Sequence, residues 1–182
     1  MILRAGWCRR AGLTENISWM RHQHVVCAIG LIVCAAVTPA SQTAVPVALS
    51  PALRAHVKSE RFQIVTSIRG LPLGVRDELQ TLFGGQSLDI AEPGAAFQAS
   101  EAASKSKLPL RRLIAAGCSA DHCLVYYERA GKPLTWVVAL FHWTPAATRL
   151  EWSGNARGGL ATIDDVKKAV LSGAFKGPVK VW

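Results

Sequence analysis

The chain lacks a hydrophobic run long enough to cross a membrane as a helix. Its longest uncharged apolar stretch, residues 25–37, has 13 residues, whereas a spanning helix needs about 20. Arg21 and two histidines precede this stretch, and the small-residue segment TPASQ follows it. A basic segment, a short apolar segment and a small-residue exit form the layout of a secretory signal. We therefore expect residues 1–40 to be a signal peptide and the mature protein to be periplasmic or secreted.

This leader allows alternative interpretations. Cleavage is expected after Ala40, with Ala44 as the second choice. A chain starting at Met20 would have a signal of ordinary length, so residues 1–19 are a candidate misassigned extension. If residues 25–40 are retained instead, the protein is a single-pass envelope protein with a membrane anchor.

Cysteine is scarce once the leader is removed. Residues 1–40 contain three of the five cysteines, namely Cys8, Cys27 and Cys34. Cys118 and Cys123 remain, and an even number in an oxidising compartment favours a disulfide. The hairpin expected here would place opposing Cα atoms about 4.5 to 5.5 Å apart, within the roughly 4.4 to 6.8 Å that a disulfide tolerates. We expect the two cysteines to close the hairpin.

Two other uses of these cysteines fit the sequence less well. A catalytic dithiol usually has two intervening residues and a thiol at a helix N-terminus, whereas CSADHC has four intervening residues between expected strands. A zinc site could add Asp121 and His122 to the cysteines, but no second Cys or His cluster completes it. The spacing and surroundings of the cysteines favour a structural disulfide, with thiol-redox chemistry as the alternative and no metal.

Acidic residues are few. The whole chain has 12 Asp and Glu against 21 Lys and Arg, and its net charge is +9. Beyond residue 40 the counts are 11 and 17, which leave a net charge of +6. Such a surface favours acidic partners such as an anionic envelope component or another envelope protein. Nucleic acid suits the charge but not the expected compartment. The densest basic cluster, a candidate binding surface, is Lys105, Lys107, Arg111 and Arg112.

Recognisable catalytic motifs are also missing. No nucleophile–base pair and no phosphate-binding loop is present, and His56 and His142 are isolated in the sequence. His142 faces Arg149 and Glu151 across an expected turn, so it is the histidine that could act in a cleft. We expect no catalytic residue and no cofactor, with His142 as a candidate binding residue.

Strand signals dominate the second half of the chain. Residues 110–153 read as a four-strand antiparallel meander, with a further strand in residues 62–69. One main helix is expected within residues 71–85, where Gly84-Gly85 provides the stop, and a second between the cap Thr162 and the exit Gly173. The expected register places Ile114, Val125, Tyr127, Trp136 and Val138 on one face. Three aromatic residues are candidates for a binding surface on the sheet: Trp136, Trp143 and Trp152. The predicted fold class is α+β.

The predicted organisation has three parts. The signal peptide is followed by a flexible lead-in and short helix over residues 41–60, and by a single α+β domain over residues 61–182. The leader, the basic surface and the lack of catalytic motifs indicate a small exported, non-enzymatic binding or interaction protein of unknown ligand. A membrane contact is expected only if the leader is retained.

The leader generates a direct test. Mass spectrometry of the protein recovered from the periplasm should show a chain that begins at Ser41 or a few residues later. A recovered chain that still contains residues 25–40 would show that the apolar segment is an anchor.

Overall fold

The computed structural model describes residues 48–100, 107–156, 158–180 and 182. The leader, its expected cleavage positions and Lys105 lie outside the described residues. Among the helices in the described ranges, none has both the length and the apolar character needed to cross a membrane.

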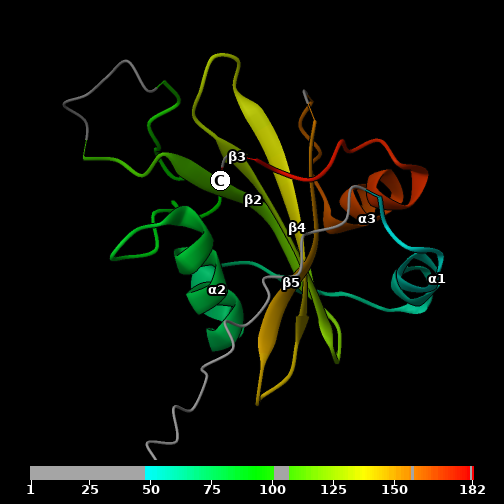
Figure 1. Ribbon diagram of the computed structural model, residues 1–182. Helices are drawn as coiled ribbons and strands as arrows, with labels where there is room; N and C mark the ends of the chain where they lie inside the picture. Colours follow the sequence, from blue (N-terminus) through cyan, green and yellow to red (C-terminus); the bar gives the residue numbers. More distant parts are fainter. Residues whose placement is uncertain (1–47, 101–106, 157, 181) are drawn as a thin grey trace, which may run out of the picture. The chain divides into compact units, whose positions relative to one another are not determined.

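One antiparallel sheet organises the described chain (Figure 1). Its five strands lie in the order β1-β2-β3-β4-β5. Their bounds are β1 Gln63–Val65, β2 Arg111–Cys118, β3 His122–Arg129, β4 Thr135–Trp143 and β5 Thr148–Ala156. The helices are α1 Pro51–Ser59, α2 Leu73–Phe83 and α3 Ile163–Ser172, with a 3-10 turn at Ile68–Gly70. The predicted class, α+β with an antiparallel sheet, is confirmed.

Helices cover both faces of the sheet (Figure 1). On one face, α2 packs Val75 and Leu79 against alternate residues of β2, β3 and β4; we call this the α2-side core. On the other face, α1 and α3 pack against the intervening residues and form the α1/α3-side core. Because side chains alternate along a strand, the apolar run in β4 supplies both cores.

The starts of α1 and α3 and the ends of α2 and α3 are formed by residues that suit helix termini. Ser50 accepts a hydrogen bond from the Leu53 amide at the start of α1, and Thr162 accepts one from the Asp165 amide at the start of α3. Gly84 and Gly173 end α2 and α3 with φ of 68° and 77°. This left-handed conformation favours glycine because it has no Cβ.

The register differs from the expected one at Tyr127. The sequence predicts that Tyr127 faces Ile114 and Trp136, but in the structure it faces Leu113 and Val137. The pairing of Cys118 with Cys123 is as expected.

Two local irregularities cause the difference. Between β2 and β3 the register shifts at Leu113/Ala115, which leaves Ile114 without a partner. Between β3 and β4 the last pair is Arg129 and Thr135, so the connection spans residues 130–134 rather than four residues. A shift of one residue moves a side chain to the opposite face. Consequently Val125 and Tyr127 lie in the α2-side core, whereas Ile114, Trp136 and Val138 pack in the α1/α3-side core.

The only two tyrosines of the chain are adjacent in β3 and fully buried on opposite faces. The Tyr126 hydroxyl donates to the Gly158 carbonyl and accepts from the Leu160 amide. Burial raises the pKa of Tyr126, and burial also raises the pKa of Tyr127, because the phenolate is poorly solvated inside the protein.

Phenolate absorbance should therefore show no step near pH 10 while the protein is folded. Because both folded-state pKa values lie above the unfolded value of about 10, their contribution to stability is complete below that pH, falls above it, and is lost once pH has risen through the folded-state pKa values. The same titration in urea should show both tyrosines ionising near pH 10. A step near pH 10 with intact near-UV circular dichroism would contradict the burial of both side chains.

Candidate functional site

The tip of the β2–β3 hairpin is closed by a disulfide. Cys118 and Cys123 are paired across the two strands and their Cα atoms are 4.1 Å apart. The closed loop carries Ser119, Asp121 and His122. The Ser119 hydroxyl accepts a hydrogen bond from the His122 amide, and the Ser119 amide donates to the His122 carbonyl. The predicted disulfide is confirmed, and it holds three polar residues at one end of the sheet.

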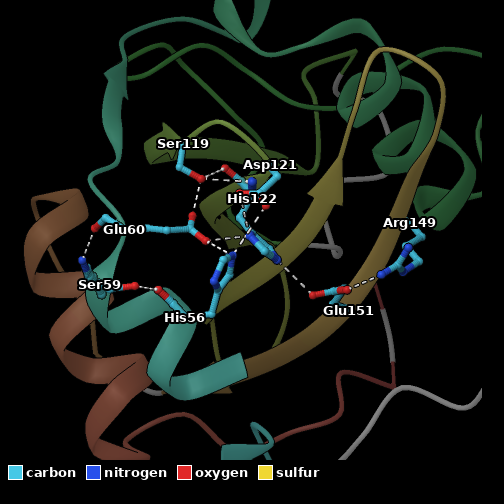
Figure 2. Close-up of polar contacts among 9 residues, drawn as sticks. His56, Ser59, Glu60, Ser119, Asp121, His122, Arg149 and Glu151 are labelled. Carbon is cyan, nitrogen blue, oxygen red and sulfur yellow. Dashed lines mark hydrogen bonds and ion pairs between the residues drawn. The ribbon is translucent and has the colours of Figure 1, made fainter. Parts of the chain in front are cut away.

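His122 is the centre of a polar cluster at this end of the sheet (Figure 2). Its side chain is only 5% exposed. Nδ1 lies 2.8 Å from Glu60 Oε1, and Nε2 lies 3.2 Å from Glu151 Oε2. Asp121 Oδ1 lies 3.4 Å from Nδ1. Both nitrogens of this buried imidazole therefore face carboxylates.

Glu60 links α1 to the hairpin. His56 and Glu60 are four residues apart and therefore lie on the same side of the helix end, where His56 Nε2 is 2.5 Å from Glu60 Oε1. The other oxygen of Glu60 accepts a hydrogen bond from the Ser119 hydroxyl. Asp121 Oδ2 also lies 3.5 Å from His56 Nε2. These contacts join a segment before β1 to the tip of the β2–β3 hairpin.

A bulge in β5 brings Glu151 to the same face. Leu140 pairs with Trp152 and Phe141 pairs with Leu150, so Glu151 has no partner on β4. The extra residue allows both Glu151 and Trp152 to point toward the α1/α3 side, as bulges commonly re-aim side chains. Arg149 Nη2 lies 2.6 Å from Glu151 Oε1, which leaves Oε2 directed at His122 (Figure 2).

A neutral imidazole cannot satisfy both contacts of His122. It has one N–H donor and one acceptor nitrogen, whereas an ionised carboxylate only accepts hydrogen bonds. The single N–H serves one carboxylate, so a second proton or a cation must lie between the other nitrogen of His122 and the other carboxylate. Burial of an unpaired charge is costly. The need for this extra proton or cation is therefore the chemical feature that best indicates what the site could hold.

The cluster contains two sets of side chains that could hold a metal ion. The helix group is His56, Glu60, Asp121 and His122, and the strand group is His122, His142 and Glu151. Within each group one nitrogen or oxygen atom of every member lies within 4.8 Å of the others. His142 pairs directly with His122 across β3 and β4, and their ring centroids are 5.2 Å apart.

In the sequence His56 and His142 are isolated and His122 lies beside the cysteines, whereas the structure brings the three histidines together. The disulfide removes Cys118 and Cys123 as ligands. The ligand candidates come from α1, the hairpin, β4 and β5, and sequence spacing does not reveal that these segments meet. Two local signals point to parts of the site: the His56–Glu60 spacing at the end of a helix, and His142 opposite Arg149, two residues before Glu151, across the β4–β5 turn.

The three candidate tryptophans do not form one surface. Trp136 and Trp152 lie on the α1/α3 side, and Trp152 is buried there. Trp143 packs on the opposite face, where it lines a groove of about 460 Å³ between α2 and the β4–β5 turn. A shared aromatic surface on one face of the sheet is therefore not formed by these side chains.

The candidate basic residues also point to different places. Arg111 is buried, lies 2.7 Å from Asp89 and stacks over Phe83. Burial lowers the pKa of Arg111. Arg112 is on the opposite face of β2 and pairs with the buried Glu128 at 2.5 Å. Lys107 is exposed. The two arginines are thus engaged in structural contacts on separate faces.

No protein-family model, no curated protein and no solved structure matches this chain. The site must therefore be interpreted from its own chemistry.

The disulfide should stabilise the hairpin that carries His122. Closing a six-residue loop is worth about 2 kcal/mol in the chain-entropy estimate. Urea denaturation with and without a reductant should show that reduction lowers the free energy of unfolding by about this amount. The same reductant should have no effect on a Cys118→Ala/Cys123→Ala variant. If the reductant lowered the free energy of unfolding equally in both proteins, the stabilisation could not be assigned to the Cys118–Cys123 disulfide.

Proposed function

We propose that this chain is a small exported binding protein and that it binds a divalent transition-metal ion at the His122 cluster. The observation that carries the proposal is the buried imidazole of His122, which has a carboxylate on each side and a further histidine beside each carboxylate. Imidazole nitrogen and carboxylate oxygen are the ligands of zinc and related ions. A cation at one nitrogen would supply the charge that a neutral His122 lacks.

The surroundings of the cysteines support a structural role for the disulfide over the thiol-redox alternative. Both cysteines lie on strands, and Cys123 is fully buried in the α2-side core. A catalytic thiol instead requires access and an electropositive setting such as a helix N-terminus. A disulfide and an apolar leader with signal layout together support an exported protein, because disulfides persist in oxidising compartments.

Zinc binding tests the proposal. The chain, purified without a polyhistidine tag and freed of metal with a chelator, should bind one more Zn²⁺ than a His122→Ala variant in equilibrium dialysis. The difference in bound Zn²⁺ between the two proteins excludes ions bound elsewhere on the chain, for example by His22 and His24. Zn²⁺ should also raise the melting temperature of the wild type, because an ion that binds only the folded state stabilises it.

Asp77→Asn provides the matched control, since Asp77 is an exposed carboxylate on α2, at the opposite face of the sheet. This variant should bind Zn²⁺ as the wild type does. Equal Zn²⁺ binding by the wild type and His122→Ala would overturn the proposal and leave the cluster as an ion-pair network.

A further inference from the structure

His122 belongs to both candidate groups, but it cannot ligate a metal for both. Its Nδ1 faces Glu60 and Asp121 in the helix group, and its Nε2 faces Glu151 in the strand group. A neutral imidazole has a lone pair on one nitrogen only. If the proposed ion is bound, one group therefore supplies ligands and the other receives the N–H of His122.

The strand group is the better held of the two. His122 and His142 are direct partners in the sheet, and Glu151 comes from the next strand. The Glu151 side chain is 17% exposed and is fixed by Arg149. In the helix group, by contrast, His56 is 47% and Asp121 41% exposed. Ligands on neighbouring strands keep their geometry more accurately than ligands at a helix end and a turn.

The helix group has the features of a supporting shell. A ligating histidine usually donates its other ring N–H to a carboxylate, which sets the tautomer and the ring orientation. Glu60 Oε1 lies 2.8 Å from His122 Nδ1, and Glu60 is itself held by Ser119 and His56. It is thus placed to accept that N–H.

We propose that the ion is bound by His122 Nε2, His142 and Glu151, and that His122 Nδ1–H donates to Glu60. This inference rests on the proposed metal-binding function and deepens it. Three protein ligands are typical of zinc sites that keep a fourth position open for water or an exogenous ligand. The fourth position here would take water or a small anion, since the ion carries positive charge.

Variants of the full-length, tag-free chain separate the two groups. Zn²⁺ affinity is measured by competition with a chelator. His142→Ala and the nearly isosteric Glu151→Gln should each lower the affinity by more than about 100-fold, because they remove ligands. Glu60→Gln should lower it about 10- to 100-fold, as for a supporting residue. His56→Ala and Asp121→Asn should lower it by less than about 10-fold.

Each outcome has a distinct meaning. If His56→Ala or Asp121→Asn abolishes binding while Glu151→Gln does not, the ion lies on the helix group; this inference fails and the metal-binding function stands. If no Zn²⁺ depends on His122, the proposed function itself fails. Thermal unfolding measured without metal should be cooperative for each variant, which shows that the variant is folded. If His142→Ala does not fold, the affinity of Glu151→Gln alone tests whether the strand group binds the ion.

The open position has its own readout. Co²⁺ replaces Zn²⁺ and gives a visible spectrum that depends on its ligands. Adding azide to the Co²⁺-loaded wild type should change this spectrum, and the change should saturate. A spectrum unaffected by azide would show that the fourth position is closed and would overturn that part of the inference.

Discussion

The contact between the buried His122 and its two carboxylate partners is the constraint on which this end of the molecule depends. Burial deprives the imidazole of water, so its nitrogens must find partners within the protein. Those partners are Glu60 at the end of α1 and Glu151 on β5. One side chain thereby connects a helix at the start of the described chain to the strand at the far edge of the sheet. The disulfide supports this contact by closing the turn that carries His122.

The double-sided sheet explains why such a site can exist at its end. β3 is buried along nearly its whole length, from His122 to Glu128, and β4 supplies side chains to both cores. With helices on both faces, the central strands are rigid and poorly hydrated. Polar groups placed at their ends are therefore held in fixed positions and exert stronger electrostatic effects than they would in water. A His–carboxylate cluster in this setting is suited to binding a cation.

Several features were predictable because their causes are local. Ser50-Pro51, Gly84 and Thr162 with Asp165 mark helix ends through backbone hydrogen bonding and glycine's conformational freedom. The pairing of Cys118 with Cys123 follows from the short connection between them. The register of β4 was not predictable in the same way. It depends on whether four or five residues connect β3 to β4. Because β4 is apolar along its length, either register would place apolar side chains on both faces of the sheet.

The antiparallel α+β character, the helix ends and the disulfide follow from the order of the residues, because alternation, capping and turn chemistry act over a few residues. Which polar residues meet depends instead on how the helices and strands pack. His56, His122, His142 and Glu151 are separated by 9 to 95 positions and are brought together by helix docking, strand pairing and a single-residue bulge. None of these long-range contacts leaves a fixed spacing in the chain, and so the site becomes visible only when the sheet is assembled.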